Sequence, residues 1–189
     1  MLALISSDLL MRLLSLLAAL WGTFGVVALL GFSVIRLSHI AITFFDYPSE
    51  IWHWLAFIIW VVFMAYSEGY KGFQLAFAPR VAARLKWLVE NPKPLLVFVA
   101  PVFAMGFIYA SRKRMLISYM IVAMVLAFIL IAEVLPSPWR AIVDAGVVVG
   151  LFWGATATLL FAIKVLLFAG SAVDPELPKH VANTTEDVS

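Results

Sequence analysis

Three charged residues flank the turn between the last two apolar runs of the chain, and they are the groups best placed to do chemistry. Glu133 lies at the end of one run, and Arg140 and Asp144 lie four residues apart at the start of the next. A carboxylate at membrane depth is costly unless it is paired, and Arg140 can pair with both acids. The pattern predicts a structural staple at the membrane boundary or, in a second interpretation, a proton- or cation-binding site.

A second polar cluster lies in residues 67–74. On a helix, Glu68, Lys71 and Gln74 form a stripe at three-residue spacing. If that helix continues within the membrane, the stripe is buried and Glu68 becomes a further candidate for binding an ion or a proton. If the helix leaves the membrane at Tyr70, Glu68 and Lys71 form a solvated pair that contributes little.

Residues 79–90 predict a short helix that lies in the headgroup plane. Wound at 100° per residue, the side chains separate into an apolar side and a charged side. The apolar side has Val81, Leu85, Leu88 and Val89, and the charged side has Arg80, Arg84, Lys86 and Glu90. We expect the charged side to face anionic lipid, with Lys71, Arg80 and Arg84 as the contacts for an anionic headgroup. An ordinary cytoplasmic loop helix is the alternative.

Small residues recur at every fourth position of the last apolar run, at Gly146, Gly150, Gly154, Thr158 and Ala162. Residues at this spacing line one face of a helix, so a second helix can approach there to backbone contact. The pattern predicts a helix-packing surface, within the subunit or between subunits, and we expect a homo- or hetero-oligomer through this run. A ligand lying against the bare backbone is a further alternative.

Other classes of site have little support in the sequence. The chain has no cysteine, and no nucleophile elbow, HExxH or Walker motif occurs. His39 and His53 could hold a haem or metal between helices, but we expect them to be polar anchors at the interface. A net charge of only +2 does not indicate a nucleic-acid surface. We therefore expect no catalytic residue, no metal and no cofactor.

Composition places the chain in a bilayer. Hydrophobic residues make up 65% of the 189 residues and charged residues 13%, with a mean hydropathy of +1.06, outside the range of soluble domains. The five long apolar runs cover residues 9–35, 52–70, 95–110, 115–134 and 145–169. The sequence predicts an all-α polytopic membrane protein, with one embedded helical domain over 1–169. We expect a polar, disordered tail over 170–189.

The run 95–110 is at or below the length needed to span a membrane, and Pro101 lies near its centre. If it crosses, the 13 basic residues divide seven to six between the two sides. If it dips in and returns, only Arg36 and Arg140 lie outside, which fits the positive-inside rule. We favour four crossings with a re-entrant segment over five crossings. The N-terminus would then be cytoplasmic, in a bacterial-type inner membrane.

Two functions fit these patterns. The first is a non-catalytic membrane protein, an assembly or scaffold subunit that acts through helix packing and contact with anionic lipid. The alternative is a small oligomeric transporter or channel that uses a membrane carboxylate, with Glu133, Asp144 or Glu68 as the coupling group.

Overall fold

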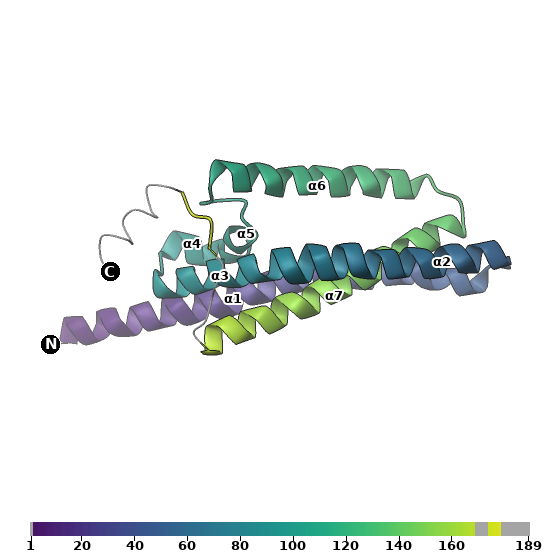
Figure 1. Ribbon diagram of the computed structural model, residues 1–189. Helices are drawn as coiled ribbons and strands as arrows, with labels where there is room; N and C mark the ends of the chain where they lie inside the picture. The colour runs from purple at the N-terminus through teal and green to yellow at the C-terminus, as the bar shows by residue number, and fades with distance from the viewer. Residues whose placement is uncertain (1, 169–173, 179–189) are drawn as a thin grey trace. The chain divides into compact units, whose positions relative to one another are not determined.

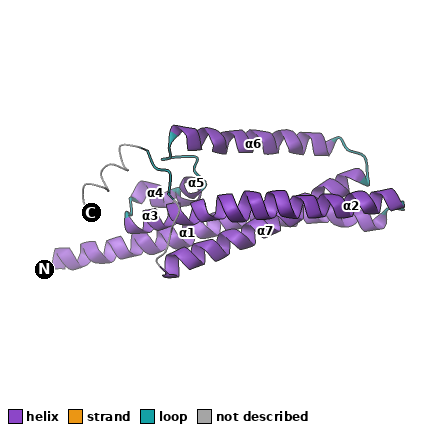
Figure 2. Cartoon of the chain, in the orientation of Figure 1, coloured by secondary structure: helices purple, strands orange, loops and turns teal. Residues whose placement is uncertain are grey.

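The computed structural model describes residues 2–168 and 174–178, and it describes side chains from residue 9 onward. Within these ranges the chain is almost entirely helical and contains no strand (Figure 2). In chain order, with α labels as in Figure 1, the helices are α1 (Leu2–Ala41), the 3-10 helix η1 (Ile42–Asp46), α2 (Ile51–Met64), the π-helix η2 (Ala65–Phe77), α3 (Ala78–Glu90), α4 (Pro94–Phe98), α5 (Ala100–Ala104), α6 (Arg112–Glu133) and α7 (Trp139–Phe168).

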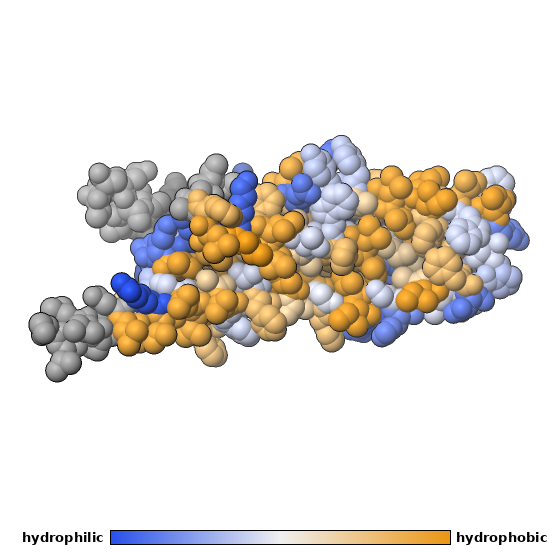
Figure 3. Space-filling view, turned by 90° about the horizontal axis from the view of Figure 1, so that it is seen from below, coloured by the Kyte–Doolittle hydropathy of each residue, from blue (hydrophilic) through white to orange (hydrophobic). Residues whose placement is uncertain are grey.

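Four helical stretches of the described chain are long and apolar enough to cross a membrane. They are Leu9–Asp46, Ile51–Glu90, Arg112–Glu133 and Trp139–Phe168. Hydrophobic side chains make up most of the surface seen in Figure 3, and large apolar residues such as Leu20, Phe32 and Leu130 are exposed. An exposed apolar surface of this kind is stable in lipid and not in water. The all-α fold and the integral membrane location predicted from the sequence agree with these findings.

The apolar run 95–110 does not form a fifth long helix. Helix α4 ends at Phe98, and Val99 departs from helical geometry with φ −99° and ψ 25°. Pro101 lies in the first turn of α5, where a missing amide proton costs nothing. A further crossing would need about 20 helical residues, and this part of the described chain has two helices of five residues each. The re-entrant arrangement therefore remains our proposal.

Contacts divide the chain into two compact units, which we call the first and the second unit. The first contains Met1–Val26, Pro79–Met120 and Leu160–Ser189, and the second contains Val27–Ala78 and Ile121–Leu159. Helices α1, α6 and α7 each contribute residues to both, so the units are not separate segments of sequence. Each unit is described on its own below.

Each unit has its own buried cluster. In the first unit, Trp87 and Leu88 of α3 pack with apolar residues of α1, α4 and α5. The buried members of this cluster are Ala18, Trp87, Leu88, Leu96, Val97, Ala100 and Phe103. In the second unit, Phe44 is fully buried with Ala141 and Ile142, and its ring stacks on Phe57 with centroids 4.7 Å apart.

Helix α3 differs from the interfacial helix that the sequence suggested. The helical stretch is unbroken from Ile51 to Glu90, so the chain does not turn at Gly69 or Gly72 before α3 begins. Residues on both sides of α3 are buried, namely Val81, Ala82, Ala83, Arg84, Leu85, Trp87 and Leu88. This burial is greater than a helix lying in the headgroup plane would have, and the interfacial position of residues 79–90 stays a prediction. Residues of α1 and of the broken segment 94–110 cover this helix within the first unit.

Candidate functional site

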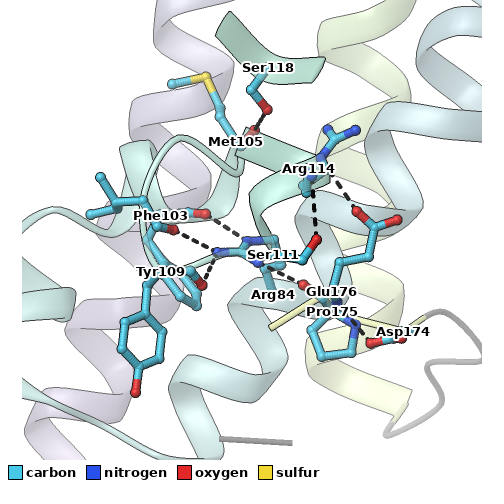
Figure 4. Close-up of polar contacts among 11 residues, drawn as sticks. Arg84, Phe103, Met105, Tyr109, Ser111, Arg114, Ser118, Asp174, Pro175 and Glu176 are labelled. Carbon is cyan, nitrogen blue, oxygen red and sulfur yellow. Dashed lines mark hydrogen bonds and ion pairs between the residues drawn. The ribbon is translucent and has the colours of Figure 1, made fainter. Parts of the chain in front are cut away.

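The most highly organised polar site of the first unit surrounds the guanidinium group of Arg84. This side chain is only 1% exposed, and most of its neighbours on α3 are buried apolar residues. Its Nε donates to the carbonyl oxygen of Phe103 at 2.7 Å. Its Nη2 donates to the carbonyls of Ile108 at 2.9 Å and Tyr109 at 3.0 Å. Its Nη1 donates to the carbonyl of Pro175 at 2.6 Å, as Figure 4 shows.

The broken segment explains why carbonyls of residues 103–109 can accept hydrogen bonds from Arg84. Helix α5 ends at Ala104, and positive φ angles at Gly106 (81°) and Tyr109 (51°) take the backbone out of helical geometry. Carbonyls outside a regular helix cannot use internal hydrogen bonds, and within a membrane no bulk water replaces them. Arg84 supplies these bonds, and its guanidinium also lies over the Phe103 ring at 4.2 Å from the centroid. The arrangement holds the irregular backbone against α3.

We call Arg84 and the four carbonyls that it contacts (Phe103, Ile108, Tyr109 and Pro175) the arginine cage. A second arginine of the same unit lies beside it. Arg114 of α6 is 4% exposed, and its Nε lies 3.7 Å from Oε2 of Glu176. The Ser111 amide donates to the carbonyl of Glu176 at 2.9 Å. Ser118 Oγ donates to the Met105 carbonyl at 3.2 Å, so α6 also holds the turn after α5 (Figure 4).

Arg84 was predicted to contact anionic lipid, but with residues 174–178 in place its guanidinium contacts the chain itself, and the lipid contact stays a prediction. Its donors are taken by four backbone carbonyls, and its side chain is buried. The helical wheel contains a signal for this result, because Arg84 lies three residues after Val81 and four before Leu88, which both belong to the apolar stripe. An arginine that borders an apolar stripe is a candidate for burial.

The other two predicted lipid contacts take no part in the hydrogen bonds of Arg84 described above. Lys71 is an exposed residue of the second unit, with Nζ 4.8 Å from the centroid of the Tyr66 ring. Arg80 is a half-buried residue of α3 in the first unit. Both stay candidates for contact with an anionic headgroup.

The glycines of α7 face the α2 and η2 helices within the second unit. A Cβ atom at Gly146 would lie 2.5 Å from the Trp60 ring, one at Gly150 would lie 3.1 Å from Glu68 Cβ, and one at Gly154 would lie 2.5 Å from the Phe73 ring. Thr158 and Ala162, farther along the ridge, are both fully buried. The glycine face is thus covered within the chain, and an oligomer contact through α7 would have to use another face.

The predicted polar stripe of residues 67–74 is divided by the structure. Glu68 is exposed and contributes its Cβ to the contact with Gly150. Gln74 Oε1 accepts a hydrogen bond from Trp153 Nε1 at 2.7 Å. Gln74 therefore ties η2 to α7 within the second unit, while Glu68 and Lys71 remain at the surface.

The residues around the α6–α7 turn are brought together in part. Arg140 Nε lies 3.8 Å from Asp144 Oδ2, and both of these atoms are buried without a hydrogen bond. Arg140 Nη1 donates to the main-chain carbonyl of Glu133 at 3.5 Å, whereas the Glu133 side chain is exposed. The staple therefore pairs Arg140 with Asp144, and it holds Glu133 through its backbone.

Among the described residues, no three His, Asp or Glu side chains come together as a metal site would require. His53 lies at the start of α2, where its Nδ1 accepts a hydrogen bond from the Glu50 amide at 3.2 Å in a capping box. Its ring also makes an edge contact with Trp139, with centroids 5.1 Å apart. His39 is exposed. His53 thus caps a helix.

Sequence reasoning missed Arg114, Ser111 and Glu176. Their contacts, and that of Arg84 with Pro175, join positions 62 to 91 residues apart, and no local pattern marks such pairings. The basic triplet 112–114 was visible only as a contribution to topology. Comparison with known protein families, curated proteins and solved structures gives no match. The geometry alone therefore carries the functional argument.

Proposed function

We propose that this protein is a non-catalytic integral membrane protein, an assembly or scaffold subunit that works through helix packing and contact with anionic lipid. The observation that supports this proposal is that polar side chains of both units bond to other parts of the chain. The Arg84 guanidinium is taken up by backbone carbonyls, and Gln74 and Trp153 join two helices. Groups with these partners stabilise the fold and do not converge on a reacting molecule.

The surface of α6 indicates where a partner would bind. Residues 121–131 are all exposed, so this part of the helix has no covered face. In lipid, helices associate through close van der Waals packing at small residues. Ala123 and Ala127 lie four residues apart on this stretch and give one face that permits such an approach. We therefore place the proposed assembly contact on α6, with lipid covering the remainder.

This proposal predicts a change in assembly state when the small face of α6 is filled. We expect Ala123→Leu combined with Ala127→Leu to weaken a co-purifying oligomer or partner complex by about tenfold or more in dissociation constant, since the helices could no longer approach closely. The measurement is the mass of the complex in mild detergent by light scattering. Val125→Leu with Ile129→Leu is the matched control, because these positions lie on the opposite side of the same helix. A wild-type protein that is monomeric in detergent and in nanodiscs, with no bound partner, would contradict the proposal.

A second function, transport of an ion or proton by an oligomer, is favoured by one observation. Asp144 is 4% exposed in α7, and its Oδ2 is buried without a hydrogen bond, with Arg140 Nε 3.8 Å away. Ionisable groups held in this way within membrane helices often belong to ion or proton pathways. Glu133 and Glu68 are exposed and have less claim to this role.

For the transport alternative we expect Asp144→Asn to reduce proton or cation flux into proteoliposomes by about tenfold or more, because the amide cannot exchange a proton or neutralise a cation. Glu133→Gln removes an exposed carboxylate at the end of α6, before the turn into α7, and should leave flux unchanged. Flux is followed with a pH-sensitive dye, and with a sodium- or potassium-sensitive dye in parallel. An absence of flux above protein-free vesicles for all three ions would remove this alternative.

A further inference from the structure

A short C-terminal segment is held against the two buried arginines of the first unit. Its described residues are 174–178, which form no helix or strand and lie within the tail that the sequence predicted to be disordered. The rest of the predicted tail lies outside the described residues. Arg84 Nη1 donates to the Pro175 carbonyl, the Ser111 amide donates to the Glu176 carbonyl, and Arg114 pairs with the Glu176 carboxylate (Figure 4). Leu177 packs on the apolar cluster of this unit.

These contacts occupy a converging set of donors. Arg84 Nη1, the Ser111 amide and Arg114 Nε all point to two neighbouring residues, Pro175 and Glu176, of which Glu176 carries the carboxylate. If the segment left, all three donors would lose these acceptors together. Two guanidinium groups and a backbone amide that converge in this way form the donor set that binds the oxygens of a phosphate.

The pairing between Arg114 and Glu176 is incomplete. The Nε to Oε2 distance of 3.7 Å is too long for a hydrogen bond, and Arg114 Nη1 is buried with no hydrogen-bond partner. A guanidinium group normally binds an oxyanion through two parallel hydrogen bonds. The carboxylate in the structure therefore leaves one edge of this buried cation unsatisfied.

Positive charge is in excess around this site. Arg114 lies close enough to Arg84 and to Arg80 for the like charges to act on each other, and the Glu176 carboxylate acts on Arg84 and Arg114 with the opposite sign. Arg112 and Lys113 add two exposed cations next to Arg114. A phosphate group, with three or more oxygens around one centre, would satisfy this site more fully than one carboxylate does.

The segment is also held in a form that it can leave. Glu176 has a φ of 52°, a left-handed conformation that is unfavourable for a residue with a side chain. Its side chain is 37% exposed, so water competes for the carboxylate. The Glu176 amide bonds to Asp174 Oδ1 at 2.8 Å, within the segment itself. The strained turn and the exposed carboxylate both favour exchange with another anion.

We propose that Arg84, Ser111 and Arg114 form a binding site for a phosphate-bearing anion, with the chain's own Glu176 segment as its intramolecular competitor. This inference rests on the proposed function, because it names the anionic-lipid site of the scaffold and a means of its regulation. The ligand is a phosphate group, from an anionic phospholipid headgroup or from a soluble phosphate. Binding displaces residues 174–178, and release lets them return.

The test is a titration of the full-length protein in detergent by native mass spectrometry, with phosphatidylglycerol, phosphatidylcholine or inorganic phosphate as the probe. Glu176→Gln removes the competing carboxylate and should tighten binding of phosphatidylglycerol by about tenfold. Glu90→Gln is the matched control, because it removes an exposed carboxylate of the same unit that pairs with Lys86. Adding Arg114→Gln to Glu176→Gln should abolish the gain. If Glu176→Gln does not fold, Glu176→Asp should give a smaller gain, since the shorter carboxylate withdraws from Arg114.

Displacement of the segment is measured separately. The native chain has no cysteine, so a single Pro178→Cys reports on the tail through its rate of alkylation, which should rise when phosphatidylglycerol is added. An equal gain with inorganic phosphate would support the site and assign it to soluble phosphate. Equal phosphatidylglycerol binding by Glu176→Gln and Glu90→Gln would overturn the inference. Assembly mass is recorded on the same samples, so an intact oligomer without this response would remove the inference alone, and a lost oligomer would count against the proposed function.

Discussion

Arg84→Met is expected to lower the free energy of unfolding by about 3–5 kcal/mol, because several carbonyls lose their donor together. The substitution fills a similar volume with an apolar side chain, so the loss reflects hydrogen bonding more than packing. The carbonyls of Ile108, Tyr109 and Pro175 would lose the Arg84 donors that they have in the structure. Each buried carbonyl left without a donor costs about 1–3 kcal/mol. The expected result is local opening of residues 103–110 at temperatures where the second unit stays folded.

The measurement is unfolding in mixed detergent micelles followed by circular dichroism, with hydrogen exchange of residues 103–110 as the local readout. Arg84→Lys should lose part of this stability, because one ammonium group cannot reach four carbonyls in the geometry of a planar guanidinium. Lys86→Met, two residues along the same helix, should cost less than about 1 kcal/mol, since its pair with Glu90 is largely exposed. An Arg84→Met protein with wild-type stability and exchange would show that the cage does not stabilise the fold.

The sequence predicted the membrane helices well because their signal is local. Long apolar runs bounded by charges leave few alternatives in lipid, and four of the runs lie within the long helices of the described chain. The short length of the run 95–110 and Pro101 within it both indicated a break in the helix. In the structure the break lies two residues before Pro101, at Val99. Composition and breaker residues thus gave the elements of the fold.

The arginine cage could not be predicted because it depends on contacts between distant positions. The wheel placed Arg84 at the border of an apolar stripe, but nothing in residues 79–90 shows that carbonyls of residues 103, 108 and 109 need its donors. The contacts of the C-terminal segment could not be predicted for a similar reason. Its polar, proline-containing sequence predicts disorder, and nothing local in it indicates the contacts of residues 174–178 with Arg84, Ser111, Arg114 and the apolar cluster.

The small-residue ridge was visible in the sequence, whereas the register of its partner helix was not. Trp60, Met64 and Glu68 follow at intervals of four and face Gly146 and Gly150, but the next contact is Phe73, five residues after Glu68. The π-helix η2 accounts for this step, because its hydrogen bonds span five residues, as from the Ala78 amide to the Phe73 carbonyl. A regular α-helix would place Gly72 opposite Gly154. The wider turn places the Phe73 ring there instead.

Gly154→Ala is therefore expected to destabilise the second unit by about 1–3 kcal/mol, the usual cost of overfilling a packed interior. The added methyl carbon would lie 2.5 to 2.8 Å from three atoms of the Phe73 ring, so the ring or the helix must move. The matched control is Gly31→Ala, where a Cβ atom meets nothing within 4 Å, and this change should raise stability by up to about 1 kcal/mol through helix propensity.

Adding Phe73→Leu to Gly154→Ala should recover part of the loss, and the double-mutant cycle then gives the interaction between the two positions directly. The wild type, Gly154→Ala, Phe73→Leu and the double variant are compared by their unfolding midpoints in the same micelles. If Gly154→Ala and Gly31→Ala had the same effect, the close contact between α7 and η2 would not exist in the folded protein. A coupling of about 1 kcal/mol or more between positions 73 and 154 would instead establish that the five-residue step in η2 sets the register of the two helices.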